Sequence, residues 1–141
     1  MTRRTAADAP VGAELPERVF PVTRADLVRY AGASGDFNPI HWSDRVATSV
    51  GLPGVIAHGM LTMGLAGRAV SDWAGDPAAV VEYHVRFGRP VEVPDDDRGA
   101  EIAVRGVVAA GLDGGRVRVD LTVTSGGEKV LSLARAVVQL A

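Results

Sequence analysis

The stretch VIAHGMLTMGLAGRAV, residues 55–70, is the most apolar long segment of the chain, and it decides the fold. Its apolar side chains face more than one side of a helix over residues 57–73, which is typical of a helix enclosed by other elements. The segment contains His58 and Arg68, and it is shorter than the ~20 residues that a membrane span requires. We therefore expect a buried helix in a protein that does not enter a membrane.

Beyond this helix the periodicity changes from helical to alternating. In residues 81–87, apolar side chains alternate with Glu82, His84 and Arg86, which predicts a half-buried strand with His84 exposed. Three further strands, joined by two glycine-rich turns, are predicted over residues 100–110, 117–123 and 129–141. The second half of the chain is therefore expected to form an antiparallel sheet.

The chain before the central helix contains shorter elements. ELPERVFPVT, residues 14–23, predicts a short strand. Thr23 is then the N-cap of a helix over residues 24–34, and Asp26 is the acidic partner of a capping box. Ser43 can cap a second, short helix over residues 44–50, which the glycines and proline at 51–54 end.

The order of these elements predicts the fold class. A strand, short helices, one long helix and a run of antiparallel strands make an α+β domain, with a curved sheet wrapped round the central helix. A chain of 141 residues fits one domain of ordinary size, which we place at residues 13–141. Residues 1–12 are predicted to be a loose tail. One sheet face stays uncovered by a single helix, so self-association through the edge strands is plausible.

The composition excludes several classes of function. The formal net charge of −2 gives no clustered basic surface for nucleic acid. The chain has no cysteine, which excludes disulfides, thiolate catalysis and cysteine-bound metals. Three scattered histidines and the acidic turn Asp95–Asp97 give no metal-ligand spacing, so no metal is expected. No apolar core follows residues 1–10, so they do not read as a signal peptide and the expected location is the cytoplasm.

The stretch GASGDFNPIHW, residues 32–42, contains the first candidate catalytic residues. A loop turned by Asn38 and Pro39 can direct the carboxyl of Asp36 and the ring of His41 toward one point. Such a pair can hold a water molecule and exchange protons with a substrate. Taken alone, however, the same residues are what any tight loop uses, and a simple hydrogen-bonding pair is the alternative.

The start of the central helix is the second candidate. A helix start presents unpaired N–H groups and the positive end of the helix dipole, which suit a carbonyl oxygen that develops negative charge. Gly59 lets a ligand approach the backbone closely. The alternative is that His58 and Gly59 merely start a packed helix.

These two motifs together resemble a known family. YAGASGDFNPIHW, residues 30–42, followed by GVIAHGMLTMGL, residues 54–65, resembles the MaoC-like dehydratases, the R-specific enoyl-thioester hydratases with a hot-dog fold. NPIHWSD, AHGMLTMG and AVVEYHVRF are especially similar to the catalytic subunit of type II (3R)-hydroxyacyl-carrier-protein dehydratases. The resemblance runs from about Val11 onward.

The resemblance implies roles for individual residues. Asp36 and His41 would be the catalytic dyad, and the backbone N–H of Gly59 would bind the thioester oxygen. Asn38 and His58 would support the site. The implied reaction interconverts trans-2-enoyl and (3R)-3-hydroxyacyl thioesters and needs no metal or redox cofactor.

The resemblance also implies partners. The acyl group would be carried by coenzyme A or by an acyl carrier protein, which Arg86 and Arg89 are placed to contact. Members of the family pair as homodimers, or as heterodimers with a related hot-dog subunit. Two alternatives remain: a non-catalytic acyl-binding subunit of such a heterodimer, and a hot-dog thioesterase, which would place a carboxylate on the central helix.

Overall fold

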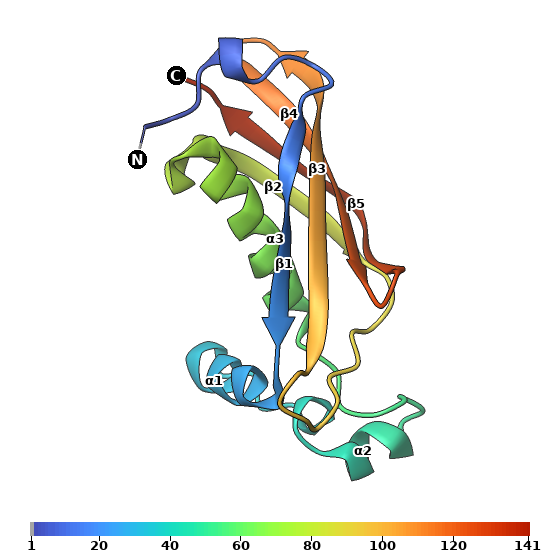
Figure 1. Ribbon diagram of the computed structural model, residues 1–141. Coiled ribbons are helices and arrows are strands. Elements are labelled where there is room, and N and C mark those ends of the chain that lie inside the picture. Colours follow the sequence, from blue (N-terminus) through green and yellow to red (C-terminus); the bar gives the residue numbers. More distant parts are fainter. Residues whose placement is uncertain (1) are drawn as a thin grey trace.

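The computed structural model describes residues 2–141 and confirms an α+β fold, in which a curved antiparallel sheet packs against one long helix (Figure 1). The sheet has the strand order β1-β3-β4-β5-β2. Its strands are β1 (Glu14–Val22), β2 (Val80–Phe87), β3 (Ala100–Leu112), β4 (Arg116–Ser125) and β5 (Glu128–Gln139). The helices are α1 (Arg24–Ser34), α2 (Asp44–Ser49) and α3 (Gly59–Ala74), and short 3-10 turns cover Ala6–Asp8, Pro39–His41 and Pro77–Ala79. No helix in residues 2–141 has the length and apolar character for a membrane crossing.

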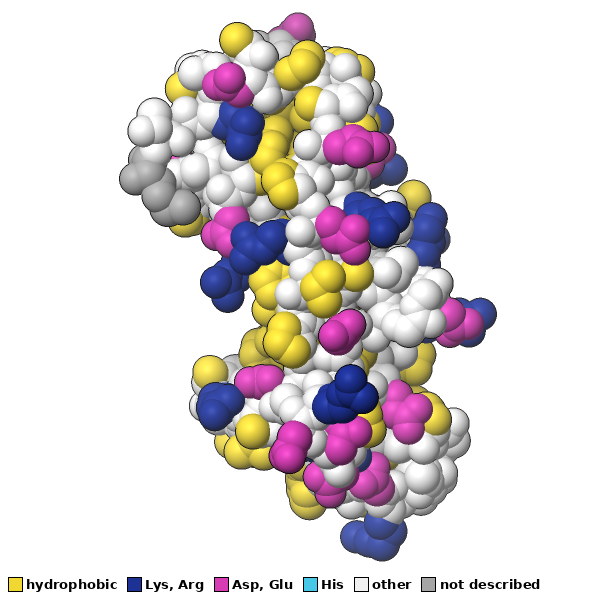
Figure 2. Space-filling model, viewed as in Figure 1, with side chains coloured by type: hydrophobic (Ala, Val, Ile, Leu, Met, Phe, Trp, Pro, Cys, Tyr) yellow, Lys and Arg dark blue, Asp and Glu magenta, His cyan; other side chains and the backbone are white. Residues whose placement is uncertain are grey.

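The alternating pattern of the strands sets which side faces α3. In β4, Val117, Val119, Leu121 and Val123 are all buried, whereas the residues between them are not. Charged side chains of both signs are interspersed over the upper part of the face shown in Figure 2, and acidic side chains gather at its lower end. The side chains of α3 that are buried complete the core: Thr62, Ala66, Ala69, Val70, Trp73 and Ala74.

The end of β2 packs closely on α3 because two glycines leave room for two aromatic rings. A Cβ atom at Gly59 would lie 3.0 Å from the ring of Phe87, and one at Gly67 would lie 2.9 Å from the ring of Tyr83. The Tyr83 hydroxyl donates to the carbonyl of Met63 at 2.7 Å. The first turn of α3 is thereby held against the last residues of β2.

Both predicted N-caps are confirmed. Thr23 and Asp26 form the complete capping box of α1, and the Ser43 side chain accepts from the N–H of Val46 at the start of α2. The helix boundaries differ from the prediction by one or two residues, since α3 begins at Gly59 and α2 ends at Ser49. At the end of α1, Gly35 takes the left-handed conformation with φ 75°, which turns the chain into the loop that follows.

The prediction of a loose tail over residues 1–12 is wrong for the described part, residues 2–12. The Arg4 N–H donates to the carbonyl of Ala74 at 2.9 Å, and its side-chain Nε donates to the carbonyl of Trp73 at 2.9 Å. Its guanidinium lies over the Trp73 ring, 4.9 Å from the centroid. The carbonyls at the end of a helix lack partners within it and carry partial negative charge, so an arginine is well placed there.

Candidate active site

The loop after α1 is organised by its own polar side chains. One carboxylate oxygen of Asp36 accepts from the N–H of Asn38 at 3.1 Å, and the side-chain oxygen of Asn38 accepts from the N–H of Ile40 at 3.2 Å. The N–H of His41 donates to the Asn38 carbonyl at 3.0 Å. These bonds form a short 3-10 turn that orients Asp36 and His41 to the same side.

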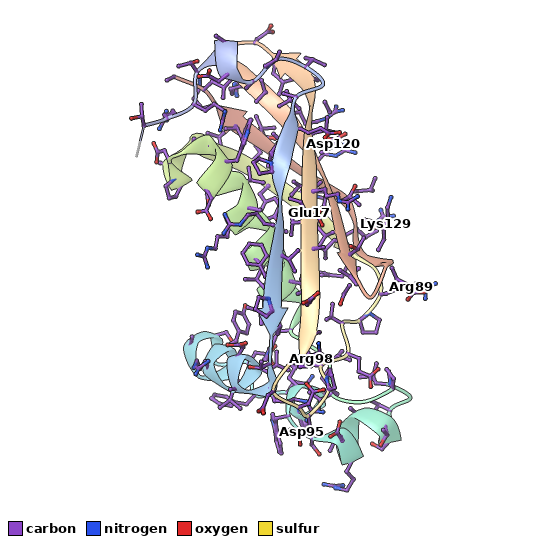
Figure 3. The ribbon with its side chains drawn as sticks, in the orientation of Figure 1. Glu17, Arg89, Asp95, Arg98, Asp120 and Lys129 are labelled. Carbon is purple, nitrogen blue, oxygen red and sulfur yellow. The ribbon has the colours of Figure 1, made fainter. Side chains whose placement is uncertain are left out.

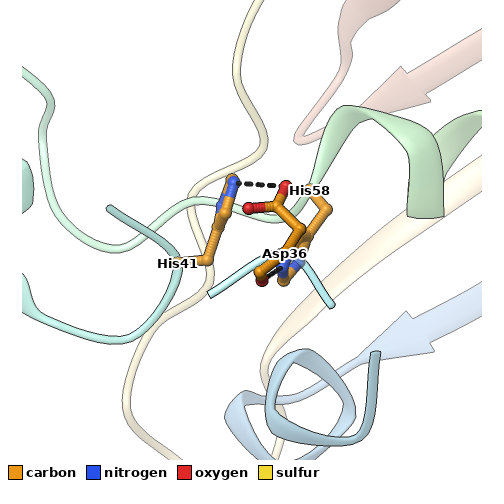
Figure 4. Close-up of side chains that lie close together, drawn as sticks. All are labelled: Asp36, His41 and His58. Atoms are coloured by element: carbon orange, nitrogen blue, oxygen red, sulfur yellow. Dashed lines mark hydrogen bonds and ion pairs between the residues drawn. The ribbon is translucent and has the colours of Figure 1, made fainter. Parts of the chain in front are cut away.

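His41 is oriented by the segment that precedes α3. Its Nδ1 lies 2.7 Å from the carbonyl of Ile56, and a carbonyl can only accept, so Nδ1 carries the proton. The other ring nitrogen, Nε2, is then an acceptor and lies 3.9 Å from Oδ2 of Asp36 (Figure 4). The His41 side chain is 8% exposed and that of Asp36 is 50% exposed, so the pair joins a buried ring to an accessible carboxylate.

The surroundings of His41 favour its neutral form. Burial lowers the pKa of His41 below its usual 6.5, the Ile56 carbonyl raises that pKa in part, the neighbouring His58 lowers it, and Asp36 raises it. The net direction is downward. At neutral pH the ring is therefore uncharged, and its Nε2 lone pair is available as a base.

The first turn of α3 presents free donors beside this pair. The carbonyl of His58 accepts from the N–H groups of Leu61 and Thr62 at 3.0 and 3.3 Å. Within residues 2–141, the N–H groups of Gly59 and Met60 have no hydrogen-bond partner. They lie at the positive end of the helix dipole, where developing negative charge is stabilised.

A pocket of about 260 Å³ is lined by His41 and by Gly59 of the first turn of α3. Its wall includes His41, Gly59, Thr62, Phe87 and Arg89, and apolar residues of the 52–57, 90–91 and 130–131 segments complete it. Asp36 does not line this pocket and approaches it only through His41. The pocket can hold a largely apolar molecule with one carbonyl near the start of α3.

His58 lies closer to the loop than the sequence suggests. It is 2% exposed, its ring stacks on that of His41 with centroids 3.8 Å apart, and its Nε2 lies 3.1 Å from the backbone carbonyl of Asp36. The expectation of scattered histidines is therefore wrong for these two. The family resemblance implied that His58 supports the site, but nothing in the sequence reveals that its neighbour is His41.

The three side chains approach one another enough to raise the possibility of a metal site. Ligand atoms of Asp36, His41 and His58 lie within 4.8 Å of one another. However, the two rings are stacked with an interplanar angle of 22°, and imidazole binds a metal along a lone pair in the ring plane. Lone pairs of stacked rings do not converge on one ion, and Nδ1 of His41 and Nε2 of His58 already face carbonyls. The absence of a metal stays a prediction that this geometry favours.

Comparison with solved structures identifies the fold as a hot-dog fold. A structure described as a MaoC-like dehydratase superimposes with a TM-score of 0.93 at 42% identity, over 99% of this chain and 43% of that chain. The R-hydratase PhaJ1 from Pseudomonas aeruginosa superimposes with a TM-score of 0.82 at 27% identity, over 98% of this chain and 86% of that one. The central helix of the fold is α3 (Figure 1).

The family model of the MaoC-like domain matches residues 6–126, and the chain belongs to this family. The 3-hydroxyacyl-thioester dehydratase X of Mycobacterium tuberculosis is 38% identical over 100 residues, which is 71% of this chain and 32% of that protein. Dehydratase Y of the same organism is 35% identical over 129 residues, which is 81% of this chain and 44% of that protein. The chain thus spans less than half the length of these two relatives.

Proposed function

We propose that the chain is a hydratase/dehydratase that interconverts trans-2-enoyl and (3R)-3-hydroxyacyl thioesters. The observation that carries this proposal is the 3.9 Å approach of the Asp36 carboxylate to Nε2 of His41, where His41 and Gly59, whose N–H has no hydrogen-bond partner in the described residues, line the same pocket. Membership of the MaoC-like family and similarity to 3-hydroxyacyl-thioester dehydratases support it.

The arrangement suits the addition of water to an activated double bond. Nε2 of His41 and Oδ2 of Asp36 are both acceptors, so one water molecule can donate a hydrogen to each. Its oxygen lone pair then points to the β-carbon of the enoyl group, and a new C–O bond forms there. The electrons of the double bond move toward the thioester oxygen, which the N–H of Gly59 stabilises.

We assign the proton transfer to His41. A neutral imidazole is a better proton acceptor than a carboxylate, so Nε2 takes the proton from the water while Asp36 orients that water. The resulting imidazolium returns the proton to the α-carbon, which restores the neutral ring. No net proton is consumed, and dehydration follows the same steps in reverse.

The proposal is tested with crotonyl-CoA, whose enoyl absorbance disappears on hydration. We expect the purified protein, alone or with a hot-dog partner subunit, to consume crotonyl-CoA and to form the 3R alcohol, identified by chiral chromatography. No turnover under either condition would reject the proposal. Release of free thiol would indicate a thioesterase instead, although the only carboxylate on α3 is Asp72, in the last turn of that helix, away from Gly59.

The pH dependence of kcat/KM should reflect the neutral form of His41. Because the pKa of this residue is lowered from 6.5, kcat/KM at pH 6.5 should still exceed half of its plateau value, and the acid limb should be centred below pH 6.5. A profile of kcat/KM in the free enzyme measures this. A limb centred at or above pH 6.5 would contradict the assignment of neutral His41 as the base.

Two arginines are placed to contact the carrier of the acyl group. Arg89 lies at the pocket, and its exposed ion pair with Glu128 at 3.1 Å is weak enough to exchange for a phosphate. Arg89 and Lys129 lie on the same side of the molecule, near the turn between β4 and β5 (Figure 3). We propose that Arg89, with Arg86 of β2, binds coenzyme A or an acidic carrier protein, and KM values for crotonyl-CoA and crotonyl-carrier protein distinguish the two.

We also propose that the chain pairs with a second hot-dog chain through the edge of β2. Both β1 and β2 are edge strands, but β1 contains Pro16 and Pro21, which block the addition of a strand. β2 has no proline and exposes Val81 and Phe87.

Light scattering tests this pairing. We expect the mass of a homodimer, or of a heterodimer once a related hot-dog subunit is supplied, and we expect Val81→Asp to shift the mass toward the monomer. Val19→Asp on β1 is the matched control, because Val81 and Val19 are each 49% exposed. Equal dissociation by both changes, or a monomer even with the related subunit, would reject the β2 interface.

A further inference from the structure

His58 contacts Asp36 and His41 and adjoins Gly59, and it takes no part in the proton transfer described above. Its ring stacks on that of His41, with centroids 3.8 Å apart, and meets the ring of Tyr30 edge to face, with centroids 4.7 Å apart. Its Nε2 faces the backbone carbonyl of Asp36 at 3.1 Å, so Nε2 carries the proton and donates it. It is also the residue that immediately precedes Gly59 and α3.

We infer that His58 is a positioning residue that fixes the Asp36 loop and the His41 ring relative to the first turn of α3, an inference that rests on the proposed function. The hydrogen bond to the Asp36 carbonyl fixes the position of the loop relative to the start of α3, and the stacking fixes the orientation of the His41 ring. Because His58 is bonded to Gly59, the two contacts also fix the loop and the His41 ring relative to the Gly59 N–H, which would bind the substrate oxygen. Catalytic geometry of this kind tolerates little displacement, and a shift of ~1 Å can reduce a rate about 100-fold.

A purely structural role does not explain this histidine. It occupies the N-cap of α3, where Ser, Thr, Asp or Asn usually bonds to the first N–H groups, but its side chain makes no capping hydrogen bond. Its Nδ1 is buried without a hydrogen-bond partner in the described structure, which is destabilising. An asparagine would cap the helix better and an apolar ring would pack without the unpaired nitrogen, so the donor to Asp36 is what histidine adds.

His58 also acts on the protonation of His41. The titratable groups that face the His41 ring are the Asp36 carboxyl from the loop and the His58 ring from the start of α3. His58 lowers the pKa of His41, and Asp36 raises it. Removal of the His58 imidazole should therefore move the titration of His41 to higher pH.

Two substitutions separate the hydrogen bond to Asp36 from the stacking on His41. His58→Phe keeps a ring for stacking and removes the donor, whereas His58→Gln keeps an N–H donor near the position of Nε2 and removes the ring. We expect His58→Phe to lower kcat about 10- to 100-fold with KM within about threefold of wild type, because the loss is one of geometry and not of substrate contact. His58→Gln should recover most of that kcat.

Nuclear magnetic resonance gives a readout that needs no turnover. The amide of Phe37 shares a peptide unit with the Asp36 carbonyl, so its signal should shift in His58→Phe and return toward wild type in His58→Gln. The ring signals of His41 should titrate at higher pH in both variants. Circular dichroism and thermal unfolding identify a variant that fails to fold. The variant that does fold is then compared with the wild type.

The outcomes distinguish this inference from the proposed function. A wild-type protein without hydratase activity would reject the function, while the Phe37 and His41 signals would still test the positioning role. Full kcat in His58→Phe, or equal losses in both variants with an unchanged Phe37 signal, would overturn the inference. The inference would also be overturned if the loss of kcat in each variant simply paralleled the decrease in its unfolding temperature.

Discussion

His41→Ala should lower kcat for the hydration of crotonyl-CoA by about 100- to 10,000-fold, the range that general acid–base catalysis supplies. The change removes the lone pair at Nε2 and the ring that bonds to Ile56, so the water loses its proton acceptor. Asp36→Asn should reduce kcat as well, since the amide offers a donor where the water needs an acceptor. KM should change little in either variant, because neither group is expected to bind the thioester itself.

The chain offers matched controls for both changes. His84 on β2 and Asp113 in the turn before β4 are exposed and lie outside the pocket. His84→Ala and Asp113→Asn should therefore keep wild-type kcat. If His41→Ala and Asp36→Asn retain activity in a folded protein, the dyad assignment is wrong, whatever the wild-type enzyme catalyses.

Gly59→Pro should produce the second large loss, about 100- to 1,000-fold in kcat relative to Gly59→Ala. Proline lacks the N–H that is proposed to bind the substrate oxygen, yet it is favoured at the first position of a helix. The preceding residue, His58, has φ −58° and ψ 129°, which a following proline accepts. The helix should therefore form normally in the proline variant.

Gly59→Ala is the control that isolates the N–H group. Both substitutions place a Cβ atom about 3.0 Å from the Phe87 ring, which is 52% exposed and can move by a few tenths of an ångström. The alanine variant measures the cost of that contact with the N–H retained. Equal kcat in the two variants would exclude the Gly59 N–H as an oxyanion donor, and comparison of their unfolding temperatures checks that α3 is intact.

The elements that local chemistry determines were predictable from the sequence. Thr23 with Asp26, and Ser43, indicated where α1 and α2 begin, because N-capping depends on neighbours in the chain. The alternating residues of the four later strands indicated the sheet, because one of its faces is buried against α3. The resemblance to the family pointed to Asp36, His41 and Gly59, with Asn38 and His58 in support, and the structure places the first three at the same end of α3.

The parts that depend on distant contacts could not be predicted. Arg4 contacts Trp73 and Ala74, which lie some seventy residues away, and no local pattern marks that contact. Likewise, His58 meets His41 only after the 55–58 segment bonds to the loop, through Nδ1 of His41 and through the N–H of Ile56 to the carbonyl of Ile40. Each of these pairs is a product of tertiary packing.

The attachment of residues 2–5 to the end of α3 matters for how the protein is handled. Thr2 lies directly against Gly75, and the N–H of Ala141 donates to the carbonyl of Arg4 at 2.9 Å, so both chain ends share one crowded corner (Figure 1). An affinity tag fused at either end therefore adds bulk where the helix that carries Gly59 is anchored. Enzyme prepared for kinetics is best measured after the tag has been cleaved.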